Sequence, residues 1–158
     1  IAPTKAFNMA GLQTAAVSVP NKVLRHKIWR GLNTDEVAEG NVFAVEAAIA
    51  AFTKGEKWLD ELRQYLFENK RYVAEFIKKE LPDLELIPSE ATYLLWISCE
   101  KLTNHSDHFA RMIRKKTGLY LSAGSQYSGD GDTFLRMNIA CPRSVLQDGL
   151  QRLKEALA

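Results

Sequence analysis

Lys5 is the residue whose surroundings point most directly to covalent chemistry. It is the only charged side chain in the segment PTKAFNMAGL, residues 3–12. An apolar environment lowers the pKa of an amine, and only the neutral amine attacks a carbonyl carbon. Composition alone favours a second interpretation, an exposed lysine near the beginning of the chain. The residues by themselves leave both interpretations open.

The other polar side chains do not form a pattern typical of a metal or nucleophile site. His105 and His108 are three residues apart, but Asp107 is the only acid beside them. We therefore expect a solvated helix start rather than a metal site. Asp130 and Asp132 flank a glycine, and no further ligands follow at the spacing of a calcium loop. Neither a P-loop nor a dinucleotide-binding glycine motif occurs, and we predict that the protein binds no metal.

Length and composition are those of an ordinary globular protein. The 158 residues fit one domain, or one domain plus part of another. Hydrophobic residues make up 46% and charged residues 25%, which excludes disordered and low-complexity classes. The net charge of +2 gives no reason to expect nucleic acid. No apolar stretch approaches the roughly 20 residues of a transmembrane helix, so we expect no membrane partner.

The cysteines and the first residue give expectations about the cellular location of the protein and about whether the chain is part of a longer one. Cys99 and Cys141 are too few for a disulfide scaffold and indicate idle thiols in a reducing cytoplasm. No secretory signal opens the chain. Because Ile1 is not an initiator Met, we expect that a segment was removed or that the chain is part of something longer.

Three helices are expected in the first half of the chain. Asn21 is a plausible cap for a helix that runs to about Arg30. Residues 41–53 are rich in alanine and apolar on nearly every side, which predicts a helix buried against several neighbours. Residues 56–81 carry the clearest helical stripe, and Pro82 ends it. A helix of that length, nearly 40 Å at ~1.5 Å per residue, commonly bridges two lobes.

The second half of the chain predicts a β-β-α-β-β-α unit. Strands are expected at 84–87, 92–98, 119–122 and 133–140, and helices at 105–117 and 143–157. Gly118 is a suitable C-cap for the first of these helices, and Pro142 is suited to the first turn of the second. The fold class is therefore α/β, with an α+β small domain in which helices pack on an antiparallel or mixed sheet. Taken alone, Arg136 predicts a strand arginine paired with an acidic neighbour on the sheet surface.

Three segments, in order, resemble the fold-type I pyridoxal-phosphate enzymes, the aspartate aminotransferase superfamily. They are TKAFNMAGLQ from Thr4, EATYLLW from Glu90, and LSAGSQY with FLRMNIACPR from Leu121 to Arg143. The first segment is most similar to the cystathionine β-lyase-like branch, the MalY/PatB type of C–S lyases. Gln13 and Ala2 stand where many aminotransferases carry a phosphate-binding Arg and Ser. This departure argues against an ordinary aminotransferase and against a phosphate contact from this segment.

The resemblance implies specific roles. Lys5 matches the catalytic lysine that binds pyridoxal 5'-phosphate through a Schiff base and moves the Cα proton. Arg136 matches the arginine that binds the substrate α-carboxylate, a role suited to its planar fork of donors. Arg143 is expected to be structural, Trp96 to lie in the sheet, and Tyr127 to lie in a loop near the mouth of the site.

The resemblance also implies an organisation and an activity. Residues 1–55 would be the end of the large cofactor-binding domain, 56–81 the bridging helix, and 82–158 the C-terminal small domain. The parent enzyme would be a homodimeric C–S β-lyase that takes a small amino acid such as cystathionine or cysteine. It would release a thiol, pyruvate and ammonia. The alternatives are an aminotransferase of the same superfamily and a non-catalytic α/β module. Because most cofactor contacts lie outside this chain, we expect the 158 residues alone to be inactive and not to retain the cofactor.

Overall fold

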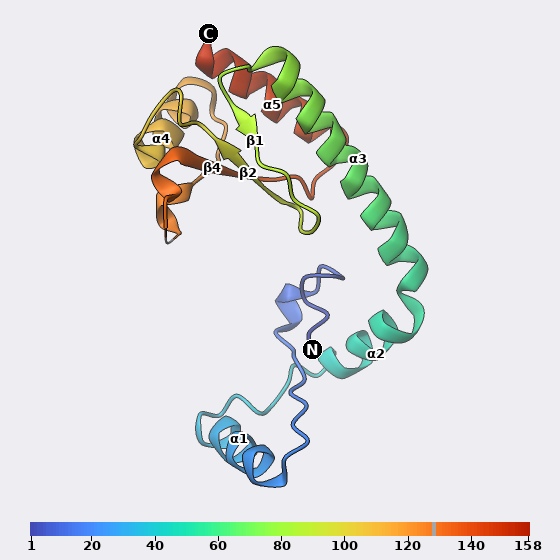
Figure 1. Ribbon diagram of the computed structural model, residues 1–158. Helices are drawn as coiled ribbons and strands as arrows, with labels where there is room; N and C mark the ends of the chain where they lie inside the picture. The colour runs from blue at the N-terminus through green and yellow to red at the C-terminus, as the bar shows by residue number, and fades with distance from the viewer. Residues whose placement is uncertain (128) are drawn as a thin grey trace. The chain divides into compact units, whose positions relative to one another are not determined.

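The structure is a computed structural model that describes residues 1–127 and 129–158 (Figure 1). The helices are α1 (Lys22–Thr34), α2 (Ala44–Lys54), α3 (Glu56–Glu80), α4 (Ser106–Thr117) and α5 (Arg143–Leu157). The strands are β1 (Glu85–Leu86), β2 (Leu94–Ser98), β3 (Ser122–Ala123) and β4 (Phe134–Asn138). Short 3-10 turns lie at Ala10–Leu12, Gly124–Gln126 and Gly131–Thr133. The chain divides into two compact units, Ile1–Arg63 and Gln64–Ala158, and the division falls within α3.

The first unit contains α1, α2 and the beginning of α3. The side chain of Asn21 accepts hydrogen bonds from the backbone N–H groups of Val23 and Leu24, both at 3.0 Å, which confirms it as the cap of α1. The helix continues past the expected end at Arg30 and through Gly31, because a single glycine weakens a helix without ending it.

The expectation that the second, alanine-rich helix is buried on several sides is wrong for this chain. In α2 only Ala44 and Ala51 are buried, whereas Val45, Ile49 and Phe52 are exposed. Burial of an apolar helix requires other elements to pack against it, and the first unit, all of whose residues are described, contains no strand.

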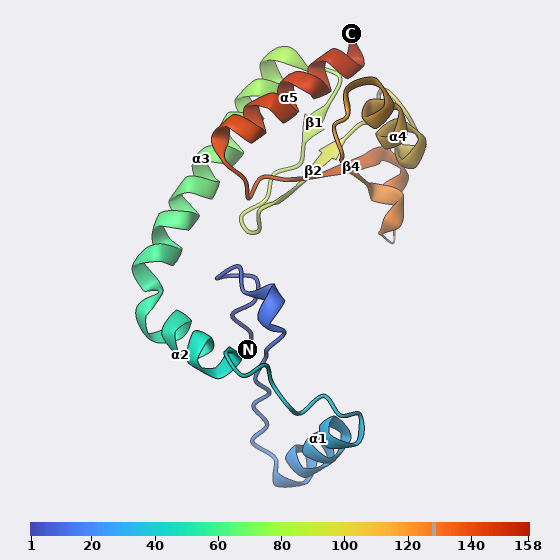
Figure 2. The same cartoon turned by 180° about the vertical axis from the view of Figure 1, so that it is seen from behind.

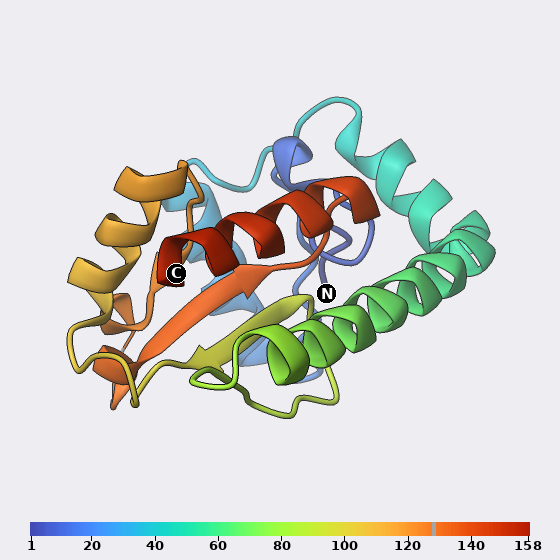
Figure 3. The same ribbon diagram turned by 90° about the horizontal axis from the view of Figure 1, so that it is seen from above.

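The second unit is an antiparallel sheet with helices packed on one face. The strand order is β1-β2-β4-β3, and each neighbouring pair is antiparallel. Alternate residues of the central strands β2 and β4 point into the hydrophobic core. The core contains residues of the sheet and of α3, α4 and α5, among them Val73, Ile77, Leu95, Ile97, Ile113, Leu135, Leu150 and Leu153. Figures 2 and 3 show α5 lying over this sheet.

The two edge strands are shorter than the sequence suggests. Strands are expected at residues 84–87 and 119–122, but β1 and β3 have two residues each, and β3 shares only residue 122 with the expected range. Each has only one neighbouring strand, so few ladder hydrogen bonds hold it. β2 begins at Leu94 rather than at Thr92, because the backbone of Thr92 is left-handed with a φ of 68°.

Candidate functional site

Lys5 lies on a tight turn at the beginning of the first unit. The backbone N–H of Phe7 donates to the carbonyl of Pro3 at 3.0 Å, and that of Met9 donates to the carbonyl of Thr4 at 3.0 Å. Pro3 is fully buried, whereas Lys5 is exposed. Within this chain, the side chain of Lys5 is therefore not covered by the apolar residues that surround it in the sequence.

The turn is anchored through Phe7, two residues after the lysine. Its ring lies 5.9 Å from the ring of Phe52, edge to face, and 5.9 Å from the ring of Trp58, stacked. Gly55, between α2 and α3, leaves the space that the Phe7 ring occupies, because a Cβ there would collide with that ring. The backbone that carries Lys5 is thus held by aromatic packing against two helices.

Arg136 lies in the middle of β4, on the face of the sheet opposite the core. It stands in register with Trp96 of β2 on one side and with Ser122 of β3 on the other. Its Nη2 lies 3.5 Å from the Ser122 hydroxyl oxygen, and its guanidinium carbon lies 4.6 Å from the centre of the Tyr127 ring. No carboxylate of the described residues lies within ion-pair distance of it. The acid-paired arginine considered from the sequence is therefore not what forms.

The ring against this arginine belongs to an aromatic cluster. The ring of Trp96 meets Tyr127 edge to face at 5.4 Å and Phe134 edge to face at 5.9 Å. Trp96 lies in the sheet, as expected, and Tyr127 lies in the loop that follows β3. Ser122 was not singled out from the sequence, because its place beside Arg136 depends on the pairing of two strands separated by a long loop.

The end of β4 is fixed by a buried asparagine of α3. Asn69 is fully buried, and its Nδ2 donates to the carbonyls of Ile139 and Cys141 at 3.0 and 3.2 Å. Its Oδ1 accepts from Nε of Arg143 at 2.7 Å, and the Tyr65 hydroxyl accepts from the Arg143 backbone N–H at 2.7 Å. Arg143 thus has the structural role expected of it. Sequence reasoning missed Asn69, because a polar residue on a helix with many charged residues resembles a surface residue.

The remaining candidates do not assemble into a reactive site. The rings of His105 and His108 are 5.9 Å apart at the exposed start of α4. Within residues 1–127 and 129–158, no three His, Cys, Asp or Glu side chains are grouped to hold a metal ion. Burial raises the pKa of Cys99 to about 11 and also raises the pKa of Cys141, so neither is a thiolate near neutral pH. None of the described helices combines the length and apolar character that crossing a membrane requires.

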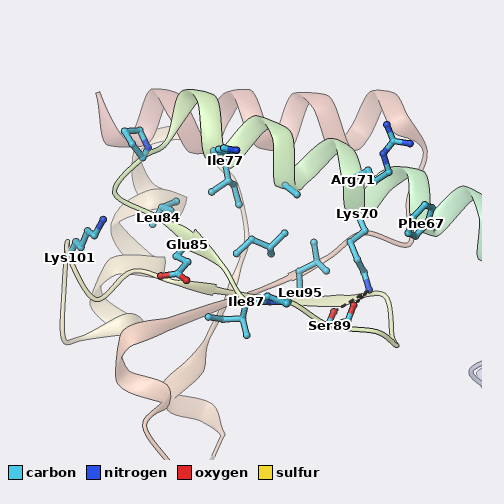
Figure 4. Close-up of a pocket in the computed structure, with 15 residues that line it drawn as sticks. Phe67, Lys70, Arg71, Ile77, Leu84, Glu85, Ile87, Ser89, Leu95 and Lys101 are labelled. Atoms are coloured by element: carbon cyan, nitrogen blue, oxygen red, sulfur yellow. Dashed lines mark hydrogen bonds between the residues drawn. The ribbon is translucent and has the colours of Figure 1, made fainter.

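A groove of about 650 Å³ lies elsewhere in the second unit, between α3 and the edge strand β1 (Figure 4). Lys70 spans it and donates to the carbonyl and the hydroxyl of Ser89, at 2.9 and 3.1 Å. Arg71, Lys101 and Glu85 are among its other charged lining residues. The lining does not include Arg136 or Tyr127, so this groove is separate from the arginine and its aromatic cluster.

Comparisons with known proteins identify a matching family and several similar proteins. The family described as aminotransferase class I and II matches residues 4–153. The chain is 36% identical to cystathionine β-lyase PatB of Bacillus subtilis and 30% identical to protein MalY of Escherichia coli, over 99% and 98% of its length. It spans only 41% and 40% of those two proteins.

Solved structures agree with these relatives. Cystalysin from Treponema denticola, which contains pyridoxal 5'-phosphate, superposes with a TM-score of 0.90 at 28% identity. A C–S lyase from Staphylococcus hominis with the same cofactor superposes with a TM-score of 0.84 at 36% identity. Both matches cover 99% of this chain and 40% of the other chain.

Proposed function

Because the chain belongs to the aminotransferase class I and II family, we propose that it works as part of a pyridoxal-phosphate-dependent C–S β-lyase. The family and the fold class are those expected from the sequence. The observation that carries the proposal is the Lys5 turn. An exposed amine stands on a backbone fixed by Phe7, inside the segment that the family match covers.

The chemistry of Lys5 fits the cofactor. A primary amine that makes no hydrogen bond or ion pair with the described residues is free to bond to the aldehyde carbon of pyridoxal 5'-phosphate. When bound, this cofactor supplies an electron sink for negative charge at the substrate Cα. We assign to Lys5 the covalent attachment and the transfer of the Cα proton.

Arg136 is the residue that we assign to the substrate α-carboxylate. Its guanidinium has no acidic partner among the described residues, and a planar fork of donors can bind a carboxylate through two hydrogen bonds. The binding would fix the orientation of the amino acid, so that its Cα proton is presented to the lysine.

The lyase branch is favoured over the aminotransferases by the relatives. The chain is 29% identical to a cystathionine β-lyase of Corynebacterium glutamicum, in addition to PatB at 36%. It is 26% identical to an LL-diaminopimelate aminotransferase of Aquifex aeolicus. The proposed net reaction of the whole protein converts a small amino acid with a Cβ–S bond and one water molecule into a thiol, pyruvate and ammonia. An aminotransferase remains the second candidate, because the family includes both activities.

The same proposal includes a domain organisation. Residues 1–55 belong to the large cofactor-binding domain, 56–81 form a bridging helix, and 82–158 form the small domain. We also propose that the whole protein is a cytoplasmic homodimer. The exposed apolar side chains of α1 and α2, such as Trp29, Ile49 and Phe52, support a further protein surface packing on the first unit.

Borohydride trapping tests the role of Lys5 in the whole protein that carries this chain. The protein is incubated with pyridoxal 5'-phosphate, reduced and digested, and the modified lysine is identified by mass spectrometry. We expect the adduct on Lys5 and its absence in Lys5→Arg. Lys22, an exposed lysine of the first unit, is the matched control and stays unmodified at equimolar cofactor. An adduct that survives in Lys5→Arg would remove the assignment.

The reaction type is tested on the same protein by following the keto-acid product. Pyruvate release from L-cystathionine without any keto-acid acceptor supports the lyase. Turnover that requires an added keto acid supports the aminotransferase. We expect the first result, and we expect it to be lost in Lys5→Arg.

A further inference from the structure

Arg136 is held by neutral groups alone, among the residues that the structure describes. The Tyr127 ring lies against its guanidinium at 4.6 Å, and the Ser122 hydroxyl lies 3.5 Å from Nη2. None of the ion pairs found among residues 1–127 and 129–158 includes this arginine, although its side chain is half-buried. Its positive charge is therefore not compensated by any described acidic side chain.

Arg114 and Arg143 also lie against tyrosine rings, whereas two other arginines of the chain are paired with acids. Arg152 donates to Asp148 at 2.7 Å, and Arg111 is paired with Asp107 one turn away on α4. Both of these ion pairs lie within a helix and are partly exposed. A carboxylate placed in this way compensates the positive charge that would attract a second carboxylate.

We propose that Tyr127 is a positioning residue, whose ring packs against one face of the Arg136 guanidinium and fixes its orientation. The N–H groups at the edge of the guanidinium, and its positive charge, stay available to a ligand carboxylate. An aromatic face attracts a guanidinium through its quadrupole and makes no hydrogen bond to the N–H groups. The ring therefore orients the arginine without competing for its donors. This inference rests on the proposed function, in which Arg136 binds the carboxylate of an amino acid.

The ring itself is held in place by the sheet. Trp96 meets Tyr127 edge to face at 5.4 Å, and Phe134 meets Trp96 edge to face at 5.9 Å. Trp96 stands in register with Arg136 across the β2–β4 pair. Tyr127, a loop residue, thus contacts one residue in each of the two central strands, Trp96 of β2 and Arg136 of β4. These contacts explain how a residue outside the sheet acts on a residue within it.

The test uses the whole protein that carries this chain, labelled with 2H and 15N, and acetate as the probe, with sodium chloride added to hold the ionic strength constant. The backbone amides of Ser122 and Trp96 report acetate binding, and the Nε–Hε signal of Arg136 reports whether its side chain is ordered before acetate is added. In the unmodified chain we expect one slowly rotating guanidinium and saturable shifts of both amides. The amides of Ile97 and Leu135, which face the core, show whether each variant is folded.

Three substitutions of Tyr127 distinguish the effect of its aromatic ring from the effects of its hydroxyl group and of a charge at the same position. Tyr127→Phe keeps the ring and should bind acetate within about twofold of the original chain. Tyr127→Leu should average the Arg136 signal and weaken binding about fivefold, which corresponds to ~1 kcal/mol. Tyr127→Glu supplies a competing carboxylate and should weaken binding at least as much as Tyr127→Leu. Tyr120→Leu removes the ring that lies 5.4 Å from Arg114 and, as the matched control, should change neither readout.

Two outcomes distinguish this inference from the function on which it rests. If Arg136→Lys weakens acetate binding but Tyr127→Leu leaves affinity and side-chain order unchanged, Tyr127 does not position the arginine, and only the inference is overturned. The same holds if Tyr127→Glu binds acetate as well as the original chain. If acetate binding is absent from the original chain, or is unaffected by Arg136→Lys, the carboxylate role of Arg136 itself is overturned.

Discussion

Replacing Asn69 with alanine should remove a large part of the stability of the second unit. The substitution deletes two donors to the carbonyls of Ile139 and Cys141 and the acceptor of the Arg143 Nε. Two neutral hydrogen bonds contribute about 1 kcal/mol each, and the bond from the charged guanidinium contributes about 2 kcal/mol. The free energy of unfolding should therefore fall by about 4 kcal/mol, a large share of the roughly 5–15 kcal/mol of a typical domain.

Urea denaturation at neutral pH, followed by circular dichroism, measures this change. For an m-value of about 1.5 kcal/mol/M, the midpoint should fall by roughly 2.5 M. The matched control is Asn104→Ala, an exposed asparagine in the loop before α4, which should change the free energy of unfolding by less than about 0.5 kcal/mol. A loss below about 1 kcal/mol for Asn69→Ala would refute the reasoning. It would mean that water replaces the amide, so that the end of β4 does not depend on α3.

Four further predictions concern the thiols, the loop after β3 and a glycine of α5. At pH 8, iodoacetamide should modify Cys141 faster than the buried Cys99, as mass spectrometry of the intact chain would show. Because the pKa of Cys99 is raised to about 11 from an ordinary value near 9, the unfolded chain loses this proton first as the pH rises. Stability should therefore fall between pH 9 and 11 more steeply than in Cys99→Ala, and equal slopes would contradict this. Gly124→Ala should lower the free energy of unfolding by about 2 kcal/mol, since its Cβ would collide with the backbone of Gly131. Gly149→Ala in α5 meets only ordinary contacts and should raise the free energy of unfolding by about 0.5–1 kcal/mol in the same urea titration.

The elements that the sequence predicted well are those that local forces determine. The long apolar stripe and Pro82 located α3, and Asn21 located the beginning of α1. Helical periodicity and capping act over a few residues, so a sequence displays them directly. The short edge strands were harder to predict, because their length depends on how many partners each strand has.

The candidate site was predictable only in part. The Lys5 segment and the Arg136 segment were both found through their resemblance to a family. The row of Trp96, Arg136 and Ser122 depends on pairing between strands that are distant in sequence, and no local pattern reveals that register. The same holds for Asn69, whose partners lie 70 and 72 residues further along the chain.

The short edge strands have a consequence for how copies of this chain meet. β1 and β3 close the two sides of the sheet with two residues each. An edge of that length offers few unpaired N–H and C=O groups to a strand of another molecule. Pro82 and Pro88 flank β1 and cannot donate from their backbone nitrogens. The second unit is therefore poorly suited to extending its sheet from one copy into the next, and edge-to-edge aggregation is disfavoured even where its concentration is high.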